Sequence, residues 1–203
     1  MRVLRALCLI AALIAGAAQA GVAQAATLSG LVLVASEDMP DPRFQETVIY
    51  LVNHNENGAF GLIVNKPQGR GPLAALLDEL GIELDGAYED ERPTGSITLH
   101  YGGPVSPEKG FVLHSADYTV DSTLVLPGGF ALTETAEVLR DIALAQGPRQ
   151  SLLLFGYSGW GPSQLEGEIA RGDWGIVDAD PDLVLGTDHQ SKWERARSGG
   201  IVI

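Results

Sequence analysis

Apolar residues recur along the chain with two different spacings. Short runs rich in Val, Ile and Leu end at Asn, Gly or Pro, which is typical of β-strands separated by turns. These runs predict strands at 30–35, 47–53, 59–65, 96–101, 111–114, 123–126, 151–155, 174–177 and 183–185. The run at 151–155 does not alternate with polar residues, which indicates a strand buried on both faces.

The second spacing, of three to four residues, predicts helices. Leucines recur at this interval between Pro72 and Gly81, which suit the start and the end of a helix. Another helix is predicted from about 134 to 146, with Thr133 as its cap, and a last one from 188 to 197.

One further helix is marked by its first residues. Ser163 stands three positions before Glu166, the spacing of a capping box in which each side chain bonds the other residue's backbone. With this helix the sequence predicts about four helices. Strands outnumber helices and do not alternate regularly with them, so we expect a single α+β domain over 26–203 with a β-rich, barrel- or sandwich-like core.

The first 25 residues have the layout of a secretory signal peptide. Arg2 and Arg5 precede an apolar run at 6–15, and A-x-A patterns follow at 18–20 and 23–25. The run is shorter than the roughly 20 residues of a membrane span, so no stable anchor is expected after cleavage. This predicts a periplasmic or secreted protein, whereas an internal start would leave it cytoplasmic.

The charge of the chain is strongly acidic. Its 203 residues carry a formal net charge of −13, with 26 acidic and 13 basic side chains. Removal of the predicted signal takes away Arg2 and Arg5, and the charge becomes about −15. A nucleic-acid partner is therefore disfavoured, because binding to phosphates requires a basic surface.

Metal and cofactor sites have little support in the sequence. The lone cysteine, Cys8, lies within the predicted signal, which leaves no disulfide or cysteine-based zinc site in the remainder. No two of the four histidines stand two or four residues apart. We therefore predict no metal site and no cofactor.

The segment 156–161, Gly-Tyr-Ser-Gly-Trp-Gly, invites comparison with the nucleophile elbow of serine hydrolases. That motif requires a glycine at the position that Trp160 occupies here. A hydrolase using Ser158 with His189 and an aspartate is kept as an alternative. The favoured interpretation is a glycine-rich turn that packs an aromatic pair.

Gln164 and Glu168 stand four residues apart and share one face of the predicted helix. Beside Trp160 and Tyr157, this pair is a candidate for a polar pocket with aromatic walls. Binding residues are commonly presented at strand ends and turns. The predicted binding site therefore comprises His54, Asn65, His114, Trp160, Gln164 and Glu168.

Many segments in this order resemble one family. The motifs are Asp-Pro-Arg-Phe at 41–44, Val-Ile-Tyr at 48–50, His-Asn at 54–55, the run 58–67, Gly-Gly-Pro-Val at 102–105, Leu-His at 113–114, the segment 156–161 and Gln-Leu-Glu at 164–166 with Glu168. Together they are similar to the YqgE/AlgH family of bacterial proteins, over about 30–193.

The resemblance implies a compact α+β fold with a β-rich core, no settled enzymatic activity and no established cofactor. One branch of the family is named as a regulator of alginate synthesis and is sometimes called transcriptional. The family pattern has alanine where Ser158 stands, which counts against a serine nucleophile. Its members usually begin near the position of Thr27 and look cytoplasmic, unlike a chain with an export signal.

These observations favour a non-catalytic binding or regulatory protein whose partner is a protein or a small molecule. The serine hydrolase and the transcriptional regulator remain alternatives. The absence of a helix-turn-helix signal and the acidic charge disfavour the regulator.

Overall fold

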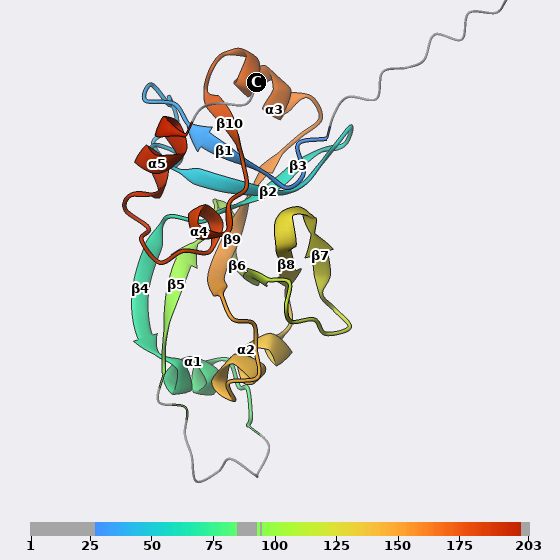
Figure 1. Ribbon diagram of the computed structural model, residues 1–203, viewed down its shortest axis with the longest axis vertical. Helices are drawn as coiled ribbons and strands as arrows, with labels where there is room; N and C mark the ends of the chain where they lie inside the picture. The colour runs from blue at the N-terminus through green and yellow to red at the C-terminus, as the bar shows by residue number, and fades with distance from the viewer. Residues whose placement is uncertain (1–26, 85–92, 94, 200–203) are drawn as a thin grey trace, which may run out of the picture.

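A ten-stranded sheet, antiparallel at all but one of its pairings, curls into a half-barrel (Figure 1). The computed structural model describes residues 27–84, 93 and 95–199. Its strands are β1 (Leu31–Ala35), β2 (Val48–Asn55), β3 (Gly58–Ile63), β4 (Pro67–Pro72), β5 (Ser96–Tyr101), β6 (Val105–Ser115), β7 (Leu124–Leu126), β8 (Phe130–Thr133), β9 (Ser151–Trp160) and β10 (Trp174–Asp178). Their order is β10-β1-β2-β3-β9-β6-β8-β7, and the antiparallel pair β4–β5 joins through the parallel pair β5–β9.

Strand β9 connects the two parts of the sheet. Its first half pairs with β5 and β6, and its second half pairs with β3 and, at Tyr157, with the start of β6. Gly156, between the halves, has a φ of +71°, and a Cβ there would lie 2.3 Å from the Gly103 carbonyl oxygen. A glycine is required at this position because other residues neither adopt that φ readily nor fit the space.

Five short α-helices lie at the ends and edges of the described sheet: α1 (Leu73–Glu79), α2 (Ala136–Ala143), α3 (Gln164–Ala170), α4 (Pro181–Val184) and α5 (Lys192–Ser198). Helices α1 and α2 contact each other at one end of the molecule, and α3 lies at the other (Figure 1). The end of α1 is well defined, because the Gly81 and Ile82 amides donate to the Asp78 and Leu77 carbonyls in a Schellman motif.

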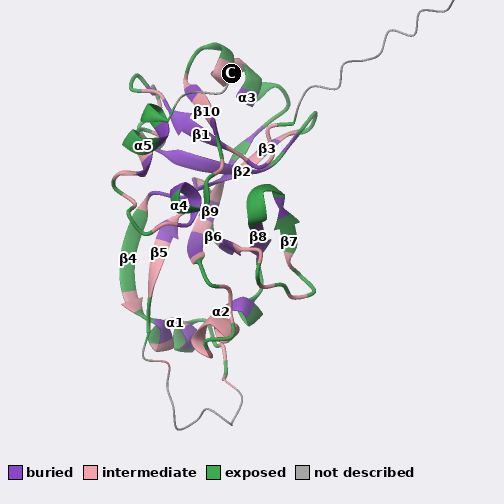
Figure 2. Ribbon diagram, viewed as in Figure 1, coloured by how far each residue is buried: buried purple, intermediate pink, exposed green. Residues whose placement is uncertain are grey.

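The core lies on both faces of the central strands. Residues 48–52 of β2 are all buried, and Figure 2 shows β1 and β2 almost entirely in the buried class. Because side chains alternate along a strand, Val48 and Tyr50 enter one cluster and Ile49 and Leu51 the other. A third cluster joins α1 and α2 to the sheet through Leu77, Val138 and Leu153.

The predicted single α+β domain with a β-rich core is confirmed, but several elements differ. The predicted strand at 183–185 falls largely on α4, where Pro181 begins the helix and the Asp180 carboxylate caps it. The predicted turn at 156–161 is the second half of strand β9. Thr133 ends β8 and does not cap α2, whose N-cap residue is Thr135.

Two strands were not predicted. One is β4, with the sequence Pro-Gln-Gly-Arg-Gly-Pro, and the other is β8, which directly follows the Pro127–Gly129 turn. The predicted signal peptide at 1–25 lies outside the described residues. Within them, no helix is both long enough and apolar enough to cross a membrane.

Candidate functional site

The Glu168 carboxylate collects three hydrogen bonds on one side of α3. Its Oε2 atom accepts from the indole Nε1 of Trp160 and from that of Trp174, each at 2.8 Å. Its Oε1 atom accepts from the Gln164 side-chain amide at 2.9 Å. The two indole rings meet edge to face, with centroids 6.1 Å apart. Gln164 and Glu168 lie on one face of α3, as their spacing predicts, and the cluster ties α3 to the ends of β9 and β10.

Tyr157 does not belong to this cluster. It packs against Phe60 and Phe111 in the other core cluster. Tyr157 and Trp160 are three residues apart on a strand, so their side chains point to opposite faces. The predicted pair of aromatic walls is therefore wrong.

The predicted capping box at the start of α3 is also absent. Ser163 has a left-handed backbone, with φ of +59°, and its side chain makes no capping hydrogen bond. The Gln164 side-chain oxygen instead accepts from the Gly161 amide at 3.1 Å. This frees Glu166 to bind His54.

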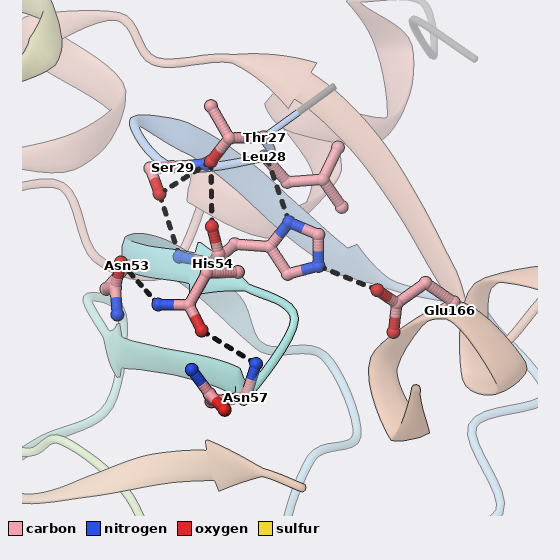
Figure 3. A network of polar contacts seen from close by, with 8 residues as sticks. Thr27, Leu28, Ser29, Asn53, His54, Asn57 and Glu166 are labelled. Atoms are coloured by element: carbon pink, nitrogen blue, oxygen red, sulfur yellow. Dashed lines mark hydrogen bonds and ion pairs between the residues drawn. The ribbon is translucent and has the colours of Figure 1, made fainter. Parts of the chain in front are cut away.

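His54 connects the first described residues to α3 (Figure 3). The Leu28 amide donates to His54 Nδ1 at 3.1 Å, so the ring proton is on Nε2, which donates to Glu166 Oε1 at 3.0 Å. The Thr27 hydroxyl donates to the His54 carbonyl, and the His54 amide donates to the Ser29 hydroxyl. The His54 side chain is only 6% exposed, so its polar atoms serve these contacts.

Asn65 is buried and braces an unusual backbone. Its Oδ1 atom accepts from the Val48 amide at 2.9 Å, and its Nδ2 atom donates to the Glu46 carbonyl at 2.8 Å. Glu46 has a φ of +56°, which is costly for a residue other than glycine. Strained backbone of this kind is often found where a protein binds a ligand.

A cavity of about 230 Å³, here called the Asn65 pocket, adjoins this brace. Glu46, Asn65 and Lys66 line one side, and His189, Trp193 and Glu194 line the other. Lys66 donates to the Gln45 carbonyl, and the Trp193 indole donates to the Ala35 carbonyl. The cavity thus combines two carboxylates, one ammonium group and an aromatic ring.

His114 lies elsewhere and is fully buried between β6 and β8. Its Nδ1 atom donates to the Ser115 carbonyl at 2.9 Å, so Nε2 accepts from the Thr133 hydroxyl at 2.9 Å. Burial lowers the pKa of His114. Because both ring nitrogens are hydrogen-bonded within the fold, the environment of His114 is that of a structural residue.

The hydrolase constellation is not formed. Ser158 is fully buried on β9, and its hydroxyl has no hydrogen-bond partner in the described part of the chain. His189 Nε2 instead faces His100 Nε2, at 3.3 Å. In the same described region, no three His, Cys, Asp or Glu side chains are grouped so as to hold a metal ion.

Comparison with known proteins identifies the family. The AlgH-like family model matches residues 32–199. The chain belongs to the AlgH-like family. A UPF0301 protein of Methylococcus capsulatus is 47% identical over 171 residues, which cover 84% of this chain and 90% of that protein. A UPF0301 protein of Ruegeria pomeroyi is 45% identical over 170 residues, which cover 83% and 89%.

Two solved structures resemble this AlgH-like chain. The solution structure of AlgH from Pseudomonas aeruginosa superposes with a TM-score of 0.67 at 38% identity, covering 87% of this chain and 92% of that one. A Corynebacterium diphtheriae protein of known crystal structure superposes with a TM-score of 0.61 at 21% identity, covering 81% and 82%. The second likeness shows a shared fold alone.

Sequence reasoning missed Trp174, His100 and Lys192 as members of polar clusters. Trp174 lies at the start of β10, six positions from Glu168, and the sequence pattern placed it only in a predicted strand. Lys192 is fully buried, although lysines are almost never buried without a partner, and its sequence context gives no sign of this.

Proposed function

We propose that this AlgH-like protein is a non-catalytic binding protein, which holds a small ligand carrying both a positive and a negative group in the Asn65 pocket. The observation that carries the proposal is the lining of the pocket, where Glu46 and Glu194 face a cavity shared with Lys66. Carboxylates select a ligand's ammonium group, and a lysine selects its carboxylate. A free α-amino acid has both groups within a volume of this order.

The backbone strain at Glu46 supports the same site. Asn65 holds the Glu46 carbonyl while φ at Glu46 stays at +56°. Glu46 lines the cavity, and its backbone is held there by Asn65. A backbone position that is already fixed adds little ordering cost when a ligand binds.

The other predicted site residues have fewer polar atoms available to bind a ligand. Both nitrogens of His114 are bonded, and the three bonds to Glu168 come from its own neighbours. Trp160 is 7% exposed and belongs to the core. The contacts of these residues support a structural role. Among the six predicted site residues, Asn65 lines a cavity.

The two alternatives have weaker support. A serine hydrolase requires a base that activates the nucleophile, whereas the buried Ser158 hydroxyl has no hydrogen-bond partner among the described residues. A transcriptional regulator requires a phosphate-binding surface, which an acidic chain of charge −13 disfavours. An electrophoretic shift with promoter DNA at low salt would favour the regulator over the proposal.

The proposal is tested with free amino acids as probes, in heteronuclear NMR titrations of the full chain. Alanine is compared with propionate and isopropylammonium, which each keep one of its two charges. We expect alanine to bind more tightly than either analogue. Lys66→Gln and Glu194→Gln should each weaken binding about fivefold or more, because each removes a charged contact.

Lys109→Gln is the matched control, since Lys109 pairs with Glu134 away from the pocket and its loss should leave the affinity unchanged. Equal binding of alanine to all variants, or no saturable binding of any amino acid, would contradict the proposed function.

We also propose export, with cleavage after Ala25, from the signal-like layout of 1–25. N-terminal sequencing of the protein from a periplasmic fraction of its native host should begin at Ala26. An intact N-terminus in the cytoplasmic fraction would refute export.

A further inference from the structure

Three basic side chains lie close together where the segment 187–198 packs on the sheet. His100 comes from β5, His189 from the loop between α4 and α5, and Lys192 from the first turn of α5. His100 and Lys192 are buried, and the two imidazole rings lie 4.6 Å apart between centroids. These groups join the segment 187–198 to the sheet.

The two histidines are arranged for the neutral state. His100 Nδ1 lies 3.2 Å from the Leu153 carbonyl oxygen, to which it donates, so His100 Nε2 carries a lone pair. His189 Nε2 then donates to that lone pair across 3.3 Å. His189 Nδ1 is left as a buried atom without a hydrogen-bond partner among the described residues. With one ring proton on His100 Nδ1 and one on His189 Nε2, both imidazoles are neutral and these protons are hydrogen-bonded. A third proton, on His189 Nδ1, would have no hydrogen-bond acceptor among the described residues.

The hydrogen bonds of Lys192 are also those of a neutral group. Its Nζ atom donates to the Val64 carbonyl at 3.0 Å and to the Val184 carbonyl at 2.8 Å. A neutral amine has two N–H groups, which these two carbonyls satisfy, whereas an ammonium group has three. In its fully buried position the third N–H of the charged form has no acceptor among the described residues.

The charged side chains around these three bases do not compensate for a positive charge on them. From the preceding loop, Asp188 favours the charged forms of Lys192 and His189, while Arg195 on α5 opposes that of Lys192. Each of the three bases also faces another base, and no carboxylate in the described chain forms an ion pair with any of them. The Val64 carbonyl is near enough to favour protonated His189 but forms no hydrogen bond with it.

We propose that His100, His189 and Lys192 form a proton-sensitive latch, which holds the segment 187–198 on the sheet while these bases are neutral and releases it when acidification charges them. Each added proton places a positive charge in a buried site beside another base. Opening of the segment hydrates that charge, so protonation and release are linked.

The directions of the pKa values agree with this arrangement. Burial, and then the neighbouring His189, lowers the pKa of His100 to about 4. Burial, and then Lys192, lowers the pKa of His189. Burial lowers the pKa of Lys192 to about 7. Opening restores ordinary values, so it becomes more favourable as the pH falls from each ordinary pKa to the lowered one.

The latch also bears on ligand binding. His189, Trp193 and Glu194, one side of the Asn65 pocket, all belong to the segment that would be released. This consequence, loss of the ligand at acidic pH, rests on the proposed function. The latch itself does not, because release of the segment is measured without any ligand.

The test is amide hydrogen exchange of the full chain at pH 7.5 and pH 5.0, corrected for intrinsic exchange rates and read by mass spectrometry. One proton taken up on opening changes the opening equilibrium about tenfold per pH unit. We expect opening of 193–198 to increase at least tenfold at pH 5.0. The core strand at 48–52 should open less often than this segment at both pH values, because its opening requires global unfolding.

Variants assign the effect to the bases. The double variant His189→Phe with Lys192→Met keeps a ring against His100 and an unbranched chain in the lysine site. It should reduce the response at least threefold, because His100 alone remains to take up a proton on opening. Lys109→Met, a matched change at an exposed lysine, should retain the full response. A full response in the double variant would overturn the proposal.

A second measurement on the unaltered chain covers the case in which the double variant does not fold. Imidazole NMR signals should show His189 gaining its proton over the same pH range in which 193–198 loses protection. Protonation of His189 with unchanged protection of 193–198, or exchange of this segment only together with the core at one common opening free energy, would overturn the latch.

Discussion

One carboxylate oxygen of Glu168 accepts the indole N–H of Trp160 across 2.8 Å. The same oxygen accepts a second indole, from Trp174, so one acidic side chain satisfies two tryptophans on different strands. An indole N–H that is buried without a partner is costly. This acidic residue, therefore, fastens α3 to the sheet.

Glu168→Ala should be destabilising by about 2–4 kcal/mol, because it leaves the N–H groups of Trp160 and Trp174 without their acceptor. Urea unfolding followed by circular dichroism measures the change. Glu137→Ala in the first turn of α2 is the control, and it should cost less than about 1 kcal/mol because the Glu137 side chain is exposed. Similar losses in the two variants would show that Glu168 does not have this role.

Ser158→Ala should leave the free energy of unfolding unchanged or raise it by up to about 1 kcal/mol. The buried hydroxyl has no partner in the described chain, so its removal takes away only a desolvated polar group. Thr133→Val is the contrasting control, because the Thr133 hydroxyl is bonded to His114 and Thr123, and its loss should cost about 1–3 kcal/mol. Labelling of Ser158 by a fluorophosphonate would instead indicate a reactive nucleophile.

Glu46→Gly should raise stability by about 0.5–1 kcal/mol while weakening the binding of amino acids. Glycine relieves the left-handed backbone but removes a carboxylate from the Asn65 pocket. Ala145→Gly is matched to it, since Ala145 also has a positive φ and ends α2 outside the pocket. The control should gain stability with unchanged binding, and if both variants bind alike, Glu46 is not a ligand contact.

The stability of the protein should depend on pH through Lys192. Its pKa is about 7 in the folded chain and about 10.4 in the unfolded chain, so the unfolded state binds the extra proton between these values. Stability is therefore complete above the unfolded value and is lost as the pH falls toward 7. Between pH 8 and 9, the unaltered chain should gain about 1.4 kcal/mol per pH unit relative to Lys192→Met, as measured by urea unfolding. Parallel pH profiles would show that Lys192 is not buried in its neutral form.

Local patterns predicted many elements because their causes are local. The strand at 96–101 matches β5 residue for residue, and Gly81 ends α1 as its positive φ requires. Strand β4 escaped prediction because its sequence contains two prolines and two glycines, and because its partner β5 follows only after α1 and the segment 80–95. Tertiary pairing outweighed the intrinsic preferences there.

The candidate site was less predictable, because its members come together over long sequence separations. The spacing of Gln164 and Glu168 revealed their contact, since four residues make one helical turn. The contacts of His54 with Glu166 and of His100 with His189 cross 112 and 89 positions of the chain. Such pairs depend on how the sheet brings its edges together, which residue spacing does not encode.

The most direct test of the proposed binding function is the position of the NMR shift changes caused by saturating alanine in the full chain. The account predicts that the largest changes fall at 45–46, 65–66 and 189–194, around the Asn65 pocket. Changes centred on α3 and the Trp160–Glu168 contact, or no changes at saturating alanine, would contradict it.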